Sequence, residues 1–152
     1  MIFLNPLKSF MEEHSPSLND DSTILHLERS SGQSIPFQVE IACTPQALTQ
    51  GLMNRHDLDQ DAGMLFVFPK PQYAEFWMKN TYLALDLIFM DQNFKVVQLY
   101  ADARPLDLKK IKSDQIIKYV LEISAGSIQH HGIQKGDLFR TESNLTNCYK
   151  GN

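Results

Sequence analysis

The chain has 152 residues, of which 43% are hydrophobic and 21% charged, and this composition suits one compact domain with its own core. Seven glycines and seven prolines exclude a collagen-like or low-complexity protein. With 14 basic against 18 acidic residues and a formal net charge of -4, the chain lacks the basic stripe that is typical of nucleic-acid-binding proteins.

The first predicted elements are a polar arm and a β-hairpin. Residues 1–22 end in a turn-rich polar stretch, so we expect them to form a flexible N-terminal arm. Apolar and polar side chains alternate over residues 23–28 and again over 35–42, as they do in half-buried strands. The turn-forming residues 30–33 lie between the two segments, which are therefore predicted to pair as a hairpin.

A short helix and a loop follow the hairpin. Thr44 is a favourable N-cap, Pro45 suits the first helical position, and Gly51 suits the position just after a helix end. Together these residues predict a helix over roughly residues 45–52. Residues 54–62 are polar and acidic and are predicted to form a loop.

The rest of the chain is predicted to be a series of short strands. They lie at residues 63–68, 75–80, 83–90, 95–100, 116–123 and 138–141, with a lysine-rich loop at 105–115 and one helical turn at 125–129. This pattern favours a mainly β fold, α+β at the margin: a small closed or partly open β-barrel with two or three short helices. We predict a single domain over residues 23–141 and a polar, mobile C-terminal tail over residues 142–152.

The two cysteines bear on the redox environment of the protein. No Cys-x-x-Cys spacing occurs, which argues against a zinc ribbon or a thioredoxin-like motif. We interpret Cys43 as a buried small hydrophobic residue and Cys148 as an exposed free thiol, in preference to a long-range disulfide. Free thiols suit a reducing compartment, and the chain as given shows neither an export signal nor a membrane span, so a cytoplasmic location is expected.

Six sequence blocks resemble a known protein family. They are residues 51–55 (GLMNR), 63–68 (GMLFVF), 76–81 (FWMKNT), 85–89 (LDLIF), 119–122 (YVLE) and 132–137 (GIQKGD). In this order and spacing they are similar to the DUF192 (UPF0127) family of prokaryotic proteins. The resemblance covers roughly residues 35–140 and implies a small, mainly β, barrel-like domain of unknown biochemical function. Many relatives carry a signal peptide or a lipoprotein anchor, which implies a location in the cell envelope, and some have been labelled regulators.

Asp86 is a carboxylate in an otherwise apolar strand. Burying a carboxylate costs several kcal/mol unless it is paired or hydrogen-bonded. One interpretation makes Asp86 a perturbed acid, base or ligand-binding group. The other makes it a structural group that accepts hydrogen bonds from the backbone or from Asn80 and holds the turn at residues 80–82. The sequence leaves both open.

Trp77 and Lys79 lie two residues apart in a predicted strand and therefore share one face. If Phe76 and Met78 point into the core, the indole and the ammonium project outward together. Such a pair can bind a ring that carries an anionic substituent, such as a sugar or a carboxylated small molecule. In the alternative arrangement, Trp77 fills the barrel and only the Lys79 ammonium reaches solvent.

Arg55 and Glu122 are the other charged candidates. The planar guanidinium of Arg55 suits a carboxylate or phosphate, although the aspartates at positions 57, 59 and 61 are competing partners for it. Glu122 stands in the middle of an apolar strand. It either faces solvent or shares the face of Asp86, in which case the two carboxyls would titrate as a coupled pair.

These residues favour a module that binds a small molecule or a glycan fragment at the mouth of the barrel. The candidate ligand-binding residues are Arg55, Trp77, Lys79, Asn80, Asp86 and Glu122. The first alternative is an enzyme with Asp86 as general acid or base and with Lys79 or Arg55 stabilising developing charge. The second is a regulatory interaction protein, suggested by the label of some relatives and by the one basic run, at residues 109–112. No metal site, no cofactor and no nucleic-acid partner are predicted, and no protein partner is indicated.

Overall fold

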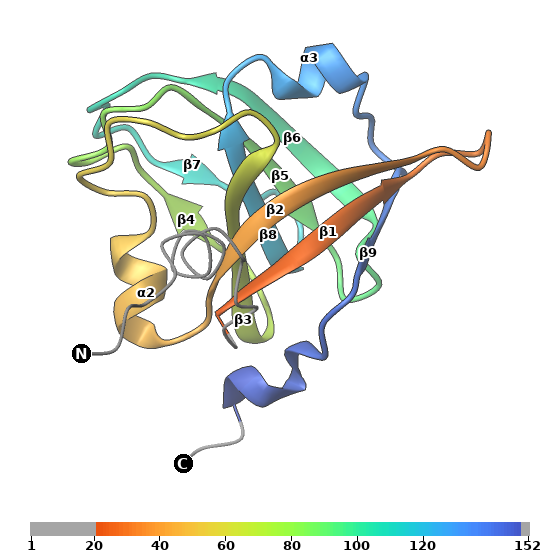
Figure 1. Ribbon diagram of the computed structural model, residues 1–152. Coiled ribbons are helices and arrows are strands. Elements are labelled where there is room, and N and C mark those ends of the chain that lie inside the picture. The colour runs from red at the N-terminus through yellow and green to blue at the C-terminus, as the bar shows by residue number, and fades with distance from the viewer. Residues whose placement is uncertain (1–20, 150–152) are drawn as a thin grey trace, which may run out of the picture.

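The computed structural model describes residues 21–149 as one curled sheet with a small second sheet beside it (Figure 1). Apart from its last two residues, the predicted N-terminal arm lies outside the described residues. None of the helices in this part of the chain is long and apolar enough to cross a membrane. The strands are β1 (Ser22–Glu28), β2 (Ser34–Ala42), β3 (Ala62–Gln72), β4 (Glu75–Phe76), β5 (Leu85–Met90), β6 (Val96–Ala103), β7 (Ile111–Lys112), β8 (Ile117–Ser124) and β9 (Leu138–Thr141), and the helices are α2 (Pro45–Gln50), α3 (Ser127–His131) and the 3₁₀ helix η1 (Leu145–Tyr149).

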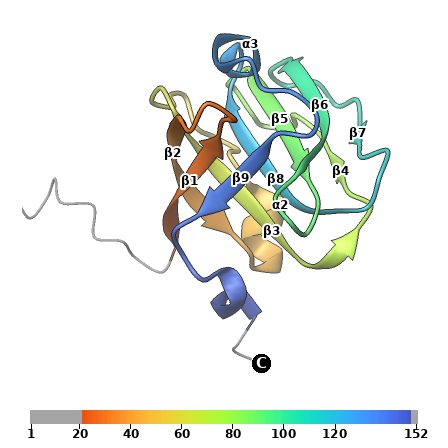
Figure 2. The same cartoon turned by 90° about the vertical axis from the view of Figure 1, so that its right-hand side faces the viewer.

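The main sheet is a partly open barrel. Its seven strands follow the order β6-β5-β8-β3-β2-β1-β9, with β2 and β3 parallel and the other neighbours antiparallel. The two edge strands meet at one end, where Lys95 bridges Leu138 and the Val96 amide donates to the Asp137 carbonyl at 2.8 Å. Helices α3 and η1 lie at opposite ends of the curled sheet (Figures 1 and 2). The prediction of a mainly β, barrel-like fold is confirmed.

The three central strands carry apolar side chains on both faces. All six residues of β5 are buried, and β3 and β8 are almost as apolar. One face lines the inside of the barrel, with Leu65, Ile88 and Leu121 among its residues. The other face forms a second, outer core that includes Phe66 and Phe89. Because both faces are buried, these strands have continuous apolar runs instead of an alternating pattern.

An outer layer of loops and short elements covers this second core. Parallel strands need a crossover connection, and residues 43–61 provide it between β2 and β3 while carrying α2 across the outer face. Residues 73–84 and 103–116 complete the layer with the β4–β7 pair. Leu52, Met78 and Ile111 anchor the three segments in the outer core.

Two predicted segments differ from the observed elements. The strand predicted over residues 75–80 ends at Phe76, because the Met78 amide turns toward the Asp107 carbonyl at 2.9 Å and Asn80 adopts a left-handed φ of 53°. The predicted lysine-rich loop contains β7, whose Ile111 pairs with Phe76. These two short strands are specified by their pairing with each other, which neither segment reveals alone.

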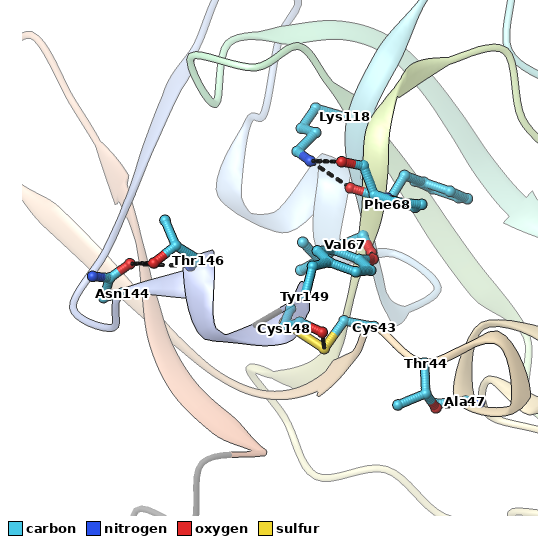
Figure 3. The surroundings of a disulfide bond; sticks show 11 residues. Cys43, Thr44, Ala47, Val67, Phe68, Lys118, Asn144, Thr146, Cys148 and Tyr149 are labelled. Atoms are coloured by element: carbon cyan, nitrogen blue, oxygen red, sulfur yellow. Dashed lines mark hydrogen bonds between the residues drawn. A yellow bond between two sulfur atoms is a disulfide. The ribbon is translucent and has the colours of Figure 1, made fainter. Parts of the chain in front are cut away.

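The interpretation of both cysteines as free thiols is wrong. Cys43 and Cys148 form a disulfide with their Cα atoms 5.6 Å apart (Figure 3). The residues after Thr141 were expected to form a mobile tail, but residues 145–149 form η1, and the Tyr149 hydroxyl donates a hydrogen bond to the Val67 carbonyl. The pairing depends on the fold, which brings the end of β2 to a segment 105 residues later in the chain.

Candidate functional site

Glu122 is a buried carboxyl on the outer face of the central strand β8. Alternation along the strand places Leu121 and Ile123 inside the barrel and directs Val120 and Glu122 toward the outer core. The residues opposite Glu122 are Met64 on β3 and Leu87 on β5. Its surroundings in the sheet are therefore apolar, and only 6% of the residue is exposed.

The Glu122 carboxyl has no hydrogen bond or ion pair with any residue in the range 21–149. Glu122 instead lines the adjacent cavity. Burial raises the pKa of Glu122 to about 8. At neutral pH the group is therefore mostly protonated, and it can both donate and accept a hydrogen bond.

A cavity of about 290 Å³ lies over this carboxyl, between β3, α2 and the β4–β7 pair. We call it the Glu122 pocket; its walls include Gly51, Phe66, Phe76, Trp77, Lys110 and Glu122. The Phe76 ring packs edge to face against Phe66, with centroids 5.2 Å apart, and forms an apolar wall. The volume lies near the lower end of the range for small-molecule sites.

Gly51 brings the end of α2 close to the floor of the pocket. Thr44 caps the helix by accepting from the Ala47 amide at 3.1 Å, and Gly51 ends it with a φ of 48°. A Cβ at Gly51 would lie 3.0 Å from the Phe66 ring and 4.0 Å from Glu122 Oε2. The predicted helix stop is therefore also the position at which the backbone must approach Phe66 closely.

Trp77 and Lys110 line the mouth of the pocket, and Lys79 lies beside Trp77 without lining the pocket itself. Trp77 is 37% exposed, and the Nζ atoms of Lys110 and Lys79 lie 4.0 and 5.0 Å from its ring centroid. Lys110 reaches Trp77 because the pairing of Phe76 with Ile111 places their neighbours side by side. The outward projection of Trp77 and Lys79 agrees with the first of the two arrangements considered from the sequence, with Met78 buried between them.

Backbone hydrogen bonds hold the loops around the pocket together. The Leu106 amide donates to the Thr81 carbonyl at 3.0 Å, and the Asn54 amide donates to the Asn80 carbonyl at 2.8 Å. Asn54, Asn80 and Leu106 all have positive φ angles. Asn80 thus holds the adjacent loop through its backbone carbonyl, while the residue is exposed and does not line the pocket. The walls are tied into one layer before any ligand arrives.

Arg55 lies outside the Glu122 pocket. Its guanidinium binds the Glu40 carboxylate through both nitrogens, Nη1 to Oε1 at 2.9 Å and Nη2 to Oε2. The hydrogen bond to Glu40 is the largest cause of the raised pKa of Arg55. The pair lines a separate, wider depression of about 960 Å³ beside β2. The partner is therefore Glu40 of β2, and none of the three aspartates suggested by the sequence.

Asp86 also lies away from the pocket, on the barrel face of β5. It is fully buried, and its carboxylate accepts from the Asp102 amide at 2.8 Å and from the Ile128 amide at 2.9 Å. These contacts agree with a structural role, although the donors come from β6 and α3 and not from Asn80. Ile123 is opposite Asp86 and Leu87 is opposite Glu122, so the two carboxyls face opposite sides of the sheet and form no coupled pair.

Comparisons with known proteins give the family. The model of DUF192, described as an uncharacterized ACR, matches residues 26–141. The chain belongs to the DUF192 family. No curated protein is found to match it.

Two solved structures resemble this DUF192 protein closely. One, from Sinorhizobium meliloti 1021, is provisionally described as a transcription regulator; it has 34% identity and a TM-score of 0.77, over 79% of this chain and 93% of that one. The other is a protein of unknown function from Novosphingobium aromaticivorans DSM 12444, with 33% identity and a TM-score of 0.74, over 78% and 84% of the two chains. The family and both relatives share the fold but supply no established activity.

The structure of this DUF192 protein brings together only part of the set predicted from sequence. Trp77 and Glu122 line a pocket on the outer face of the sheet, and Lys79 lies beside Trp77 without lining that pocket. Lys110 was missed as part of this group, because it lies in a lysine run that is typical of a solvated loop. Only the β4–β7 pairing could have placed it beside Trp77.

Proposed function

We propose that this DUF192 domain is a binding module that holds a small molecule or a glycan fragment in the Glu122 pocket. One observation carries the proposal: a buried carboxyl with no partner among residues 21–149, at the floor of a cavity whose mouth carries an exposed tryptophan. A buried polar group that lacks a partner costs free energy, and perturbed groups of this kind concentrate at functional sites. A ligand hydroxyl or carbonyl would supply the missing hydrogen bond.

The walls of the pocket suit a small hydroxylated ring. The indole of Trp77 and the edge-to-face rings of Phe66 and Phe76 offer apolar faces to C–H groups. The protonated Glu122 carboxyl can donate to one oxygen and accept from another. In this proposal Trp77, Lys79, Lys110 and Glu122 contact or attract the ligand, whereas Arg55, Asn80 and Asp86 support the surrounding structure.

Replacing Trp77 with alanine tests where the ligand binds. A panel of monosaccharides and disaccharides would be titrated against the labelled protein, with amide and indole NMR shifts as the signal. Shifts should concentrate at residues 48–53 and 75–77, and Trp77→Ala should weaken binding about tenfold because a stacked ring contributes roughly 1.5 kcal/mol.

Tyr73→Ala is the matched control, since Tyr73 is a more exposed aromatic residue outside the pocket, 65% accessible. It should leave both the affinity and the shift pattern unchanged. Both variants should keep thermal midpoints close to that of the parent protein. Shifts that map away from the pocket, or equal affinity in Trp77→Ala, would refute the proposed site.

An enzymatic role is the second candidate, and one specific observation favours it. A carboxyl that keeps its proton near neutral pH and faces a cavity has the properties of a general acid. The candidate acid is then Glu122 and not Asp86, whose oxygens are occupied by two backbone amides. A bound saccharide recovered unchanged after prolonged incubation would exclude this role and leave the binding module.

A further inference from the structure

We propose that the Glu122 pocket selects an anionic hydroxylated ring, such as a sugar acid, and releases it when Glu122 ionises. This inference rests on the proposed binding function and adds the charge class of the ligand and its control by pH. It follows from the arrangement of charge around the pocket: cations at the mouth, and at the floor a carboxyl that has no partner in the described part of the chain.

The mouth carries positive charge that no carboxylate within residues 21–149 pairs with. Among the described residues, neither Lys79 nor Lys110 forms an ion pair, and both ammonium groups lie within 5.0 Å of the Trp77 ring centroid. Glu75 also lines the pocket, but Lys112 binds its carboxylate at 3.3 Å. An anion entering past Trp77 therefore meets the Lys110 ammonium at the wall of the pocket and the Lys79 ammonium beside the same ring, and a cation would be repelled by them.

The floor accepts an anion only while Glu122 is protonated. The neighbouring strands offer no positive charge to an ionised Glu122, because the residues opposite it are Met64 on β3 and Leu87 on β5. From the outer layer, α2 presents Thr49 and Gln50, and the charged groups are Glu75 and Lys110. A protonated Glu122 donates to the ligand, whereas an ionised Glu122 repels it and has no proton to donate.

The direction of the pH effect follows from the buried position of the group. Burial places the pKa of Glu122 at about 8 in the free protein. Affinity for an anion should stay constant below that pH and fall about tenfold per pH unit above it, because each unit removes about nine tenths of the remaining protonated form. A neutral ring should show a much weaker dependence.

Three sugars of one ring shape and different charge test the inference: glucuronate, glucose and glucosamine. Trp77 is the only tryptophan of the chain, so its fluorescence reports directly on the mouth of the pocket. Titrations from pH 6 to pH 9.5 should rank glucuronate first at the acidic end, with an affinity that falls above pH 8. Glu122→Gln, which cannot ionise, should remove that fall.

Lys110→Met isolates the contribution of the mouth. It should lower the affinity for glucuronate about three- to fivefold and leave glucose unchanged, since only the charged ligand loses an attraction. Lys109→Met is the matched control, because this neighbouring lysine does not line the pocket. It should change neither the affinity for glucuronate nor the affinity for glucose. Thermal unfolding of each variant verifies folding; should Glu122→Gln fail to fold, the contrast between glucuronate and glucose in the parent protein decides the question.

The outcomes separate this inference from the function on which it rests. Binding of glucose or glucosamine as tight as that of glucuronate would overturn the charge class and leave the binding module intact. Persistence of the pH dependence in Glu122→Gln would overturn the role of this carboxyl. If none of the three sugars binds at millimolar concentration, the inference and the saccharide-binding proposal both fall.

Discussion

At the scale of single residues, the domain contains two buried carboxyls that differ in their hydrogen-bond partners. Asp86 is fully buried, but each of its oxygens accepts a backbone amide hydrogen. Glu122 is nearly as buried but has no partner within residues 21–149. Hydrogen bonds to a carboxylate stabilise its charged form, and burial without them stabilises the neutral form. The difference between a structural carboxyl and a candidate site carboxyl is therefore a difference in partners.

Glu122→Gln should change how stability depends on pH. Between the ordinary pKa of 4.5 and about 8, the unfolded chain loses the Glu122 proton while the folded protein keeps it. The free energy of unfolding therefore falls as pH rises through this interval, by on the order of 5 kcal/mol as an upper bound. Glutamine cannot ionise, so the variant should match the parent near pH 4.5 and exceed it at pH 9, as measured by urea unfolding.

Asp86→Asn provides the contrasting case at the same scale. An asparagine presents an NH₂ group to one of the two amide donors, so this variant should lose about 2–4 kcal/mol at neutral pH. If Glu122→Gln were destabilised at pH 9 as strongly as Asp86→Asn is at neutral pH, Glu122 would have to hold an essential ionic contact. The assignment of the two carboxyls would then be wrong.

At the scale of secondary-structure elements, the junction of β3 with β8 determines where Glu122 points. Gly63 pairs with Ile123, and a Cβ built at Gly63 would lie only 2.3 Å from the Glu122 carbonyl oxygen and 2.8 Å from Ile123 Cγ2. The strands can therefore keep this register only with glycine at this position. The same register fixes Glu122 on the outer face.

Gly63→Ala should destabilise the domain by about 3 kcal/mol, because the added methyl group would force the central strands apart. The measurement is chemical unfolding, supported by the fluorescence of Trp77. Gly32→Ala is the matched control: Gly32 has a φ of 86° but open space around it, so only about 1 kcal/mol should be lost. Equal losses in both variants would show that backbone conformation, and not close packing, explains Gly63.

At the scale of the whole molecule, contacts between segments distant in the sequence stabilise each end of the barrel. At one end, Arg29 follows β1 and binds Asp137 at 3.0 Å and the carbonyl of His131, the last residue of α3. At the other end, the disulfide and the Tyr149 hydrogen bond attach η1 to β2 and β3 (Figure 3). The partly open sheet is thus closed by loops and side chains where its edge strands do not pair.

Reduction of Cys43–Cys148 should lower the free energy of unfolding by about 2–4 kcal/mol, because the bond restricts a segment of 105 residues in the unfolded chain. Urea unfolding with and without a dithiol measures the loss. The chain has only these two cysteines, so the dithiol has no other bond to act on. The double variant Cys43→Ser/Cys148→Ser should unfold like the reduced protein and be insensitive to the dithiol. Identical curves for the oxidised and reduced parent would contradict the stabilising role.

Features that depend on neighbouring residues were predictable from the sequence. The hairpin of β1 and β2 follows from alternation, and α2 follows from the Thr44 cap and the Gly51 stop. The apolar run at residues 63–68 identified β3, and the family blocks indicated a mainly β barrel. Trp77 and Lys79 could also be placed together, since they are two residues apart.

Features that depend on distant segments were not predictable. Lys110 joins Trp77 through the β4–β7 pair, and Cys43 meets Cys148 across 105 residues. The sequence by itself determined the strands of the main sheet, the capped helix and the presence of two carboxyls in apolar strands. Only the tertiary structure decided that Asp86 faces the barrel and Glu122 faces the pocket, because strand order and register are set by packing over the whole chain, and a shift of one residue would exchange the two faces.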